Sequence, residues 1–201
     1  MTVKELEKLY QSRKCGIKER LNSFKALSEV EQQKEFVYCT LTPQSNAKKC
    51  WEAVEQIFKI KQFRGKNLRE ILKSKTRFYN NKAKYIIQNR EIWYDLQSRL
   101  DNTGLMPLRD WLSDNAQGYG MKEASHFLRN IGKSNNQIAI LDRHILRNLK
   151  KYHIIQGLEI KSKKDYLEKE KKYIEFANRL GIPSDELDLL LWSKENGEIF
   201  K

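Results

Sequence analysis

The sequence has few of the residues that interrupt helices: three prolines and nine glycines among 201 residues. It also lacks any stretch near the roughly 20 consecutive apolar residues that a membrane-spanning helix needs. Its opening residues, Met1-Thr-Val-Lys-Glu-Leu-Glu-Lys, are charged where a signal peptide would have an apolar core. We therefore expect no segment that spans a membrane or directs secretion, and a location in the cytoplasm.

Cysteine and histidine are also scarce. The three cysteines, Cys15, Cys39 and Cys50, are odd in number and have no paired spacing. They predict neither a disulfide framework nor a zinc or iron–sulfur site, and the three histidines have no acidic or cysteine partner at ligand spacing. We expect ordinary thiols in a reducing compartment and no metal site built from side chains.

Acidic residues are outnumbered by basic ones, 26 to 39, which leaves a formal net charge of +13. An excess of this size favours a polyanionic partner, because Lys and Arg side chains release counterions when they neutralise phosphates. Nucleic acid is the first candidate and an anionic membrane surface is the second.

Apolar residues recur at helical spacing almost throughout, and neither strand alternation nor an internal repeat is evident, so the sequence predicts an all-α protein. Ser28 and Glu31 form a capping box for a helix that runs to about Leu41. Ser45 is expected to cap the next helix. Further helices are expected over about 78–100, 107–115, 163–180 and 183–196, with a lysine-rich turn near 64–66.

The loop after the helix at 107–115 contains Gly118 and Gly120, and a further helix starts at Lys122. Helix, Gly-apolar-Gly, helix is typical of a helix-hairpin-helix, in which glycines allow a tight turn and close backbone approach. The free amides at the start of the second helix can hold a DNA phosphate without reading the bases.

The helix that starts at Lys122 has an apolar stripe that we expect to face a core. The stripe consists of Ala124, Phe127, Leu128 and Ile131. The opposite, polar face is shared by Lys122, Ser125, His126 and Arg129.

Lys122 and Asp142 are candidate catalytic residues. Lys122 opens one helix and Asp142, 20 positions later, opens the next. The helix dipole and partial burial would favour a neutral, nucleophilic amine at Lys122, whereas backbone amides would keep an N-cap carboxylate ionised. Such a pair suits displacement at a sugar C1′, with the carboxylate stabilising an oxocarbenium-like centre. Spacing alone does not separate this hypothesis from a surface lysine and an ordinary helix cap.

The two segments around these residues resemble a known enzyme superfamily. Gly118-Tyr119-Gly120-Met121-Lys122 and Ile140-Leu141-Asp142-Arg143-His144 look like the signature of helix-hairpin-helix DNA glycosylases, which carry a Gly/Pro-rich loop and a catalytic aspartate. More narrowly, residues 122–130 and 142–147 are similar to the type-2 8-oxoguanine DNA glycosylase/lyases of archaea and some bacteria. The similarity covers nearly the whole chain, and departs from the wider superfamily at Ala116-Gln117, where an apolar residue and proline are frequent.

The resemblance implies an all-α fold of two lobes with DNA in the cleft between them. Residues 31–134 would form a central lobe with the hairpin, and residues 1–30 plus 135–201 the second lobe. A monomer would extrude 8-oxoguanine from duplex DNA. Lys122 would attack C1′ and form a Schiff base, with Asp142 as its catalytic partner, and β-elimination would nick the strand 3′ to the abasic site. The enzyme would act in base-excision repair, at the nucleoid when bound to DNA.

The same resemblance implies roles for residues outside the hairpin. Gln44 and Asn46 would contact the opposite strand, while Phe78 and Trp192 would stack on the extruded purine. Lys201 would approach the base, and Gly118 and Gly120 would let the hairpin bind DNA. No cofactor is expected, although hairpin carbonyls around Gln117, Tyr119 and Met121 could hold a monovalent or calcium ion.

Three other functions remain as alternatives. A related glycosylase for another damaged base would keep Lys122 and Asp142. A non-catalytic hairpin module would bind duplex DNA and release no base. A helix-turn-helix regulator is disfavoured, because the Lys122 helix presents few base-reading side chains and no dimerisation segment is evident.

Overall fold

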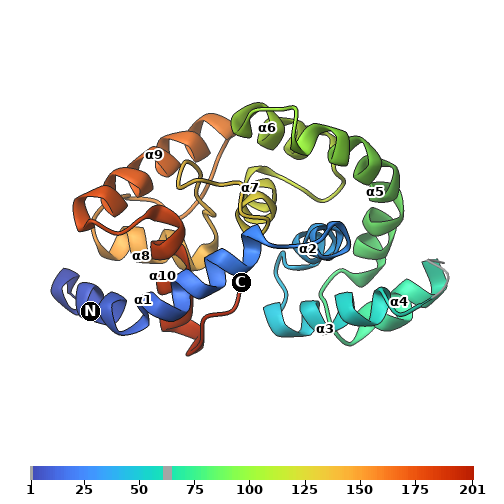
Figure 1. The fold of residues 1–201 in the computed structure, drawn as a ribbon, viewed down its shortest axis with the longest axis horizontal. Coiled ribbons are helices and arrows are strands. Elements are labelled where there is room, and N and C mark those ends of the chain that lie inside the picture. Colours follow the sequence, from blue (N-terminus) through green and yellow to red (C-terminus); the bar gives the residue numbers. More distant parts are fainter. Residues whose placement is uncertain (1, 61–64) are drawn as a thin grey trace. The chain divides into compact units, whose positions relative to one another are not determined.

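The protein is described here from a computed structural model that covers residues 2–60 and 65–201. Its regular structure over those residues is entirely helical, which confirms the all-α prediction (Figure 1). The helices are α1 (Val3–Lys25), α2 (Glu29–Leu41), α3 (Ala47–Ile57), α4 (Gly65–Lys73), α5 (Tyr79–Leu100), α6 (Leu105–Asn115), α7 (Met121–Asn130), α8 (Arg143–Lys151), α9 (Lys163–Leu180) and α10 (Ser184–Asn196).

Helix starts that are encoded locally agree with the sequence. The capping box before α2 is confirmed: the Ser28 N–H donates to Glu31 Oε2 at 2.7 Å, and the Ser28 hydroxyl accepts from the Glu31 N–H. Helices α5 and α9 lie within a residue of their predicted ranges, and α6 begins two residues before its expected start. Such starts are predictable because the cap and its partner lie three residues apart.

Two local expectations were wrong. Asn46, and not Ser45, caps α3, with its Oδ1 accepting the Lys49 N–H at 3.1 Å. Near the turn expected at 64–66, residue 64 lies outside the described residues and helix α4 begins at Gly65. This helix was missed because its nine residues bury only Leu68 and Leu72, a stripe too short to stand out.

The chain divides into two compact units. Unit 1 consists of residues 1–26 and 128–201, and unit 2 of residues 27–127. These bounds differ from those expected from the resemblance. Residues 27–30 were expected in the same lobe as the N-terminus but belong to unit 2, and residues 128–134 were expected in the central lobe but belong to unit 1. The division passes through α7, so the hairpin belongs to unit 2 and the last turn of α7 belongs to unit 1.

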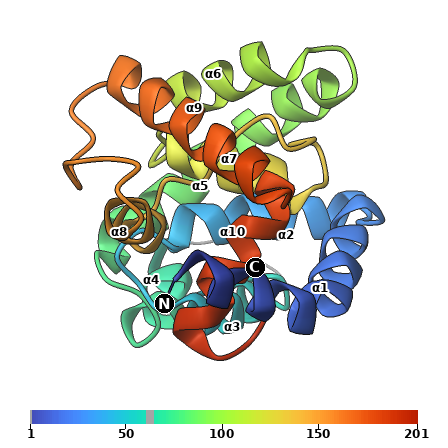
Figure 2. The ribbon, with the colours of Figure 1, turned by 90° about the vertical axis from the view of Figure 1, so that its left-hand side faces the viewer.

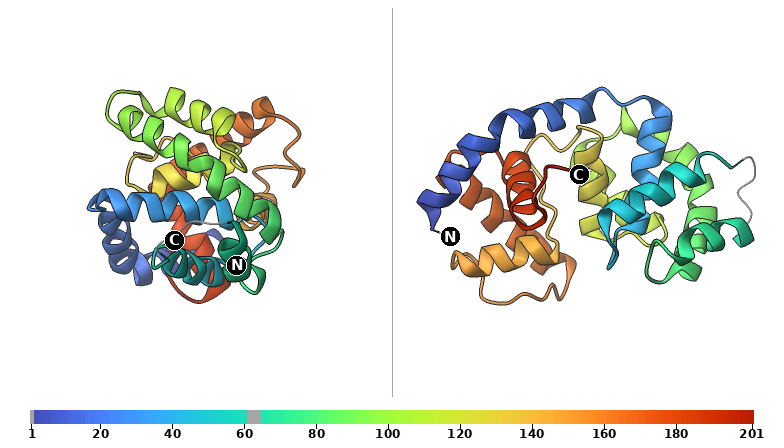
Figure 3. Two further views of the ribbon diagram at one scale, coloured as in Figure 1. Left: turned by 90° about the vertical axis from the view of Figure 1, so that its right-hand side faces the viewer. Right: turned by 90° about the horizontal axis from the view of Figure 1, so that it is seen from below.

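Unit 2 is built around an aromatic cluster. The Phe36 ring of α2 lies 5.7 Å from Trp93 of α5, 5.1 Å from Tyr119 and 5.5 Å from Phe127 of α7, between ring centroids. Helix α2 packs against α5, and α4 lies beside α5 (Figure 3). Because aromatic side chains bury large apolar areas, this cluster fixes the hairpin loop to the helices beneath it.

Unit 1 is centred on α10, which packs against α1, α8 and α9 (Figures 1 and 2). Every residue from Ser184 to Leu191 is buried, including three acidic ones. Buried carboxylates require partners, and each of these three has one on a different segment of the chain.

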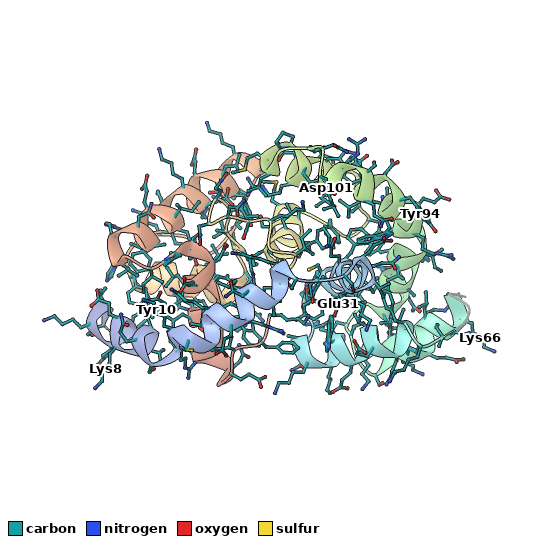
Figure 4. The ribbon with its side chains drawn as sticks, in the orientation of Figure 1. Lys8, Tyr10, Glu31, Lys66, Tyr94 and Asp101 are labelled. Carbon is teal, nitrogen blue, oxygen red and sulfur yellow. The ribbon has the colours of Figure 1, made fainter. Side chains whose placement is uncertain are left out.

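The first of these contacts ties α10 to α1. The Tyr10 hydroxyl donates to Glu186 Oε2 at 2.7 Å. Tyr10 lies on the buried side of α1, whereas Lys8 extends from its exposed side (Figure 4). Burial and the Glu186 carboxylate both raise the Tyr10 pKa, so the hydroxyl stays a hydrogen-bond donor.

The other two acidic residues contact the last turn of α7 and the chain that follows it. Asp185 Oδ2 accepts the Ser134 hydroxyl at 2.6 Å and the Asn136 N–H at 3.1 Å, and Asp188 Oδ2 lies 3.0 Å from Arg129 Nη2. Burial raises the Asp185 pKa, and its two hydrogen bonds oppose that shift. The carboxylates also lie near the N-terminus of α10, where the helix dipole favours negative charge.

The buried Arg129–Asp188 pair generates a stability prediction. Arg129→Met should lower the free energy of unfolding by about 3 kcal/mol, because it leaves the Asp188 carboxylate buried without its cation. The double variant Arg129→Met/Asp188→Asn should be less destabilised than the single one. Urea unfolding followed by circular dichroism measures both, and a double variant at least as unstable as Arg129→Met would contradict this account.

Candidate nucleic-acid interface and active site

The loop between α6 and α7 is anchored by Asn89 of α5. Asn89 Nδ2 donates to the Gln117 carbonyl at 3.0 Å, and its Oδ1 accepts the Gln117 N–H at 2.7 Å. One buried side chain thereby satisfies both backbone polar groups of a loop residue. The hairpin conformation therefore depends on a contact with α5.

Only one of the two hairpin glycines is required by the backbone. Gly118 has φ +80°, and a Cβ built there would lie 2.6 Å from Tyr85 Cδ2. Gly120 has no left-handed φ, and a Cβ there would meet nothing closer than Glu123 Oε2 at 3.6 Å. The conformation of the turn therefore requires glycine at position 118, whereas the backbone at position 120 does not require it.

Tyr119, between the two glycines, ties the loop to the core of unit 2. Its side chain is buried, and its hydroxyl donates to the Phe36 carbonyl at 2.8 Å. Burial holds the pKa of Tyr119 well above its usual value, so this hydroxyl remains a donor. The apolar position of the Gly-apolar-Gly pattern thus serves as the anchor of the hairpin.

Lys122 is the second residue of α7 and its side chain is 23% exposed. Its Nζ lies 3.1 Å from Glu123 Oε1, while Glu123 Oε2 accepts the Gly120 N–H at 3.2 Å. A single carboxylate therefore satisfies one amide at the start of α7 and holds the Lys122 ammonium beside it. This places a partly accessible amine directly after the hairpin.

The rest of the polar face of α7 is not exposed. Ser125, His126 and Arg129 are all buried. Ser125 Oγ lies 3.4 Å from Arg109 Nη1, and the His126 ring packs edge-on against Tyr38. Of these four residues, Lys122 is therefore the accessible one.

A second lysine, Lys82 of α5, holds the turn between α2 and α3. Its side chain is buried, and its Nζ donates to the Leu41 carbonyl at 2.7 Å, the Pro43 carbonyl at 2.9 Å and Ser45 Oγ at 2.8 Å. These three acceptors match the three donors of an ammonium group. They also explain why Ser45 does not cap α3.

The charge of Lys82 is sensitive to this buried setting. Its pKa is lowered to about 8, mainly by burial; the positive charges of Lys122 and Arg77 add to this shift, and Cys50 and Glu123 oppose it. Burial also raises the pKa of the Cys50 thiol to about 11, and Lys82 and Lys122 oppose that shift. Lys82 and Lys122 are therefore close enough to influence each other electrostatically.

The turn and the start of α5 present exposed side chains. Gln44 and Asn46 are exposed, and Gln44 has φ +54°. Phe78, which directly precedes α5, is 54% exposed with φ +56°, and the Arg77 guanidinium lies 5.4 Å from the centroid of its ring. Phe78 is therefore not a core residue, and its ring is open to a stacking partner.

In unit 1, Asp142 is the N-cap of α8, as the sequence predicts. Its Oδ1 accepts the Ile145 N–H at 2.8 Å, and its side chain is half-buried. Two residues later, His144 Nδ1 pairs with Glu195 of α10, whose Oε1 accepts from Asn148 Nδ2 at 3.1 Å. The start of α8 is therefore held to α10 through His144, and it carries the Asp142 carboxylate.

The chain after α10 folds back onto α1 and α10. The Phe200 and Trp192 rings are 6.1 Å apart, and the Arg20 guanidinium donates to the Phe200 carbonyl. Trp192 is half-buried, and its ring is inclined by 32° to that of Phe200. Lys201 is buried and held in place, in contrast to a frayed tail.

Sequence analysis missed Lys82 and Asn89, although a signal for both was present. The buried stripe of α5 recurs at helical spacing through Lys82, Ile86, Asn89, Trp93, Leu96 and Leu100. A lysine and an asparagine in register with apolar residues require buried acceptors and donors. Such a stripe marks them as anchors, but their partners cannot be read from it.

The described residues contain neither a side-chain cluster for a metal ion nor a helix that could span a membrane. Among residues 2–60 and 65–201, no group of three or more His, Cys, Asp or Glu side chains is arranged to hold a metal ion. One of the hairpin carbonyls considered for an ion, that of Gln117, accepts the Asn89 amide. No helix in the described part of the chain is long and apolar enough to cross a membrane.

Gly118→Ala should lower the free energy of unfolding by about 2 kcal/mol, because the new Cβ meets Tyr85 in a left-handed backbone conformation. In a Tyr85→Ala background the cost should fall to about 1 kcal/mol, the part that is due to φ alone. Gly120→Ala is the matched control and should cost less than Gly118→Ala. Urea unfolding tests all four proteins, and equal costs at the two glycines would be inconsistent with the hairpin geometry.

Burial of Lys82 makes stability depend on pH. Its pKa is about 8 in the folded chain and 10.5 ordinarily, so between these values the unfolded chain binds more protons. Raising the pH through this window should therefore stabilise the wild type relative to Lys82→Met, by about 2 kcal/mol. Urea unfolding from pH 7 to 10.5, with Cys50→Ala in both proteins, isolates this group, and a difference that is independent of pH would contradict the lowered pKa.

Comparison with known proteins extends these observations to the whole chain. The sequence model of the family described as 8-oxoguanine DNA glycosylase matches residues 17–182. A Fusobacterium nucleatum protein named 8-oxoguanine DNA glycosylase/AP lyase is 42% identical, over 98% of this chain and 96% of its own length. A protein of the same name from Thermoplasma volcanium is 37% identical over 83% of this chain and 81% of its own.

Solved structures agree with the sequence matches. The 8-oxoguanine DNA glycosylase of Thermotoga maritima superimposes with a TM-score of 0.89 at 32% identity, covering 99% of this chain and 98% of that one. The Methanocaldococcus jannaschii 8-oxoguanine glycosylase/lyase, solved with a 15mer DNA containing 8-oxoguanine, gives 0.89 at 32% identity and 99% coverage of both chains. The chain therefore belongs to the 8-oxoguanine DNA glycosylase/AP lyase family.

Proposed function

We propose that this protein is a bifunctional DNA repair enzyme that removes 8-oxoguanine from duplex DNA and then cleaves the strand at the abasic site. The observation that carries the proposal is the partly exposed Lys122 amine at the start of α7, directly after a hairpin anchored through Asn89 and Tyr119. The names of relatives that match over nearly the full chain support this substrate over another damaged base.

In the proposed reaction the neutral Lys122 amine attacks C1′ of the damaged nucleotide. The Nζ–C1′ bond forms, and the C1′–N9 bond breaks as 8-oxoguanine leaves with the bonding electron pair. The ammonium must first lose a proton, and Glu123 Oε1, 3.1 Å away, is an acceptor within reach. The secondary ammonium formed at C1′ passes a proton to the departing base, the C1′–O4′ bond breaks to give a protonated Schiff base, and O4′ takes the proton that Glu123 accepted. Water then removes a C2′ proton, the C3′–O bond breaks as the 3′ phosphate leaves with its electron pair, and hydrolysis of the imine frees the lysine.

We assign to Asp142 the stabilisation of positive charge that develops on the sugar as the base leaves. Its carboxylate accepts the Ile145 N–H and stands in the positive field at the N-terminus of α8, which favours the ionised form. A fixed carboxylate stabilises an oxocarbenium-like centre without reorganising during the reaction. Both reacting groups come from the chain, so the proposal requires no cofactor.

Five further residues would contact the DNA. Phe78, with more than half of its surface exposed, would stack on the extruded purine, as would the half-buried Trp192. Lys201 would contact the base. Gln44 and Asn46, both exposed, would contact the opposite strand.

The hairpin backbone and the net charge of the chain would both contribute to DNA binding. The backbone around Gly118 would approach a phosphate, whereas the Gly120 N–H is already engaged by Glu123. The net charge of +13 would favour binding of the protein, as a monomer, to duplex DNA. Cys15, Cys39 and Cys50 are free thiols, which is consistent with action on nucleoid DNA in the reducing cytoplasm.

Borohydride trapping on a duplex with one 8-oxoguanine opposite cytosine tests the nucleophile. The wild type should give a covalent protein–DNA adduct and Lys122→Gln should give none, because an amide cannot form a Schiff base. Base release without an adduct would mean that water is the nucleophile and the lyase proposal is wrong. Tight duplex binding with neither adduct nor release would point to another lesion or to a non-catalytic module.

Asp142→Asn provides a matched test of the carboxylate, because asparagine also caps helices and can keep the Ile145 bond. Release of 8-oxoguanine should fall about 100-fold, the effect expected when one preorganised charge is removed from a transition state. The thermal midpoint should stay near that of the wild type. Undiminished release would eliminate Asp142 as the stabilising group.

A further inference from the structure

Lys82 is a buried cation that the proposed chemistry does not use. It lies in the first turn of α5, yet its acceptors Leu41, Pro43 and Ser45 all belong to the end of α2 and the turn that follows. It is therefore a cross-link between two segments that are about 40 residues apart in sequence. The exposed residues Gln44 and Asn46 lie on that turn.

We propose that Lys82 is a positioning residue that holds the α2–α3 turn in the conformation with which it engages the DNA strand opposite the lesion. The inference rests on the proposed function, because it takes Gln44 and Asn46 as contacts to that strand. Lys82 itself is buried and acts through the turn.

The turn needs such support because one of its residues has an unfavourable backbone conformation and two carbonyls, one in the turn and one at the end of α2, are satisfied from outside the turn. Gln44 has φ +54°, a left-handed conformation that costs a non-glycine residue roughly 1–2 kcal/mol. Carbonyls at the C-terminus of a helix lack partners within the helix, and the helix dipole there attracts a cation. The Lys82 ammonium donates to the last carbonyl of α2, which satisfies the helix end, and to the Pro43 carbonyl, which stabilises the backbone next to Gln44.

The same cross-link reaches the start of α5. Ser45 Oγ accepts from Lys82 Nζ at 2.8 Å and from the Arg77 N–H at 2.9 Å, while its hydrogen points to the Pro43 carbonyl at 3.4 Å. All the hydrogen-bonding capacity of this hydroxyl is used. Because Phe78 follows Arg77, the turn and the proposed stacking residue are fixed by one network.

The charge state of Lys82 fits the role. Its pKa of about 8 leaves the amine protonated at neutral pH, so all three donors are available. The charged groups that act on it are Cys50 of α3, Arg77 before α5, and Lys122 and Glu123 of α7, of which the two cations favour proton loss. The electrostatic field at Lys82 therefore comes from α3, α7 and the residue before Phe78.

The test compares Lys82→Met with Lys84→Met, which removes the same charge from an exposed position on the same helix. The readout is the rate of borohydride trapping on a preformed abasic site, in a duplex and in the corresponding single strand. Lys82→Met should slow trapping on the duplex about tenfold, equivalent to roughly 1.4 kcal/mol, and leave the single strand within about twofold. Lys84→Met should change the two rates by a common small factor.

A double-variant cycle with Gln44→Ala locates the effect in the turn. If Lys82 acts by positioning Gln44, the duplex-specific losses should be less than multiplicative, because the second change removes an interaction that the first has already disabled. Ser45→Ala, which keeps both carbonyl bonds, should give a smaller loss of the same kind. It serves as the test if Lys82→Met does not fold.

The outcomes separate this inference from the proposed function. If the wild type gives no adduct with any abasic strand, the proposed lysine chemistry fails. If the wild type is trapped but Lys82→Met keeps the duplex-to-single-strand ratio, with both rates unchanged or both reduced equally, the positioning role is overturned. A change in the pH profile of trapping without a change in that ratio would also overturn it, in favour of an electrostatic effect on Lys122.

Discussion

A buried ammonium group decides the local structure of unit 2. Lys82 is removed from water, and an ion in that position must find acceptors inside the protein. It finds them in the last carbonyl of α2, the carbonyl before Gln44 and the hydroxyl of Ser45. The path of the α2–α3 turn, the choice of Asn46 as the cap of α3 and the start of α5 all follow from satisfying that one cation.

Unit 1 contains buried groups of the opposite charge, which likewise require hydrogen-bond or ion-pair partners inside the protein. Asp185, Glu186 and Asp188 are buried near the N-terminus of α10, and each carboxylate draws a donor from another segment. Helix α10 is thereby joined to α1 and to the chain that leaves α7. In both units, buried charge adds directional contacts to apolar packing, which by itself is non-directional. In unit 2 these contacts hold the α2–α3 turn, and in unit 1 they hold α10 to α1 and to residues 129–136.

The hairpin illustrates how side chains from elsewhere shape a motif. The Asn89 amide of α5 satisfies both backbone groups of Gln117 in the hairpin loop. Tyr119 then holds the loop against the Phe36 backbone, and Gly118 alone supplies the left-handed turn. Glu123 satisfies the Gly120 amide and pairs with Lys122. Contacts from α2 and α5 therefore stabilise the hairpin in addition to those within α6 and α7.

The sequence by itself determined the helical class, the Ser28 and Asp142 caps, the glycine hairpin and the candidate lysine, because periodicity and caps act over three or four residues. It misassigned the cap of α3 and did not identify Lys82 and Asn89 as anchors. Their partners lie 41 and 28 residues away, and a bond over that distance exists only once the helices have packed. Tertiary structure alone decided which polar residues are buried, since burial depends on neighbours that the local sequence does not encode.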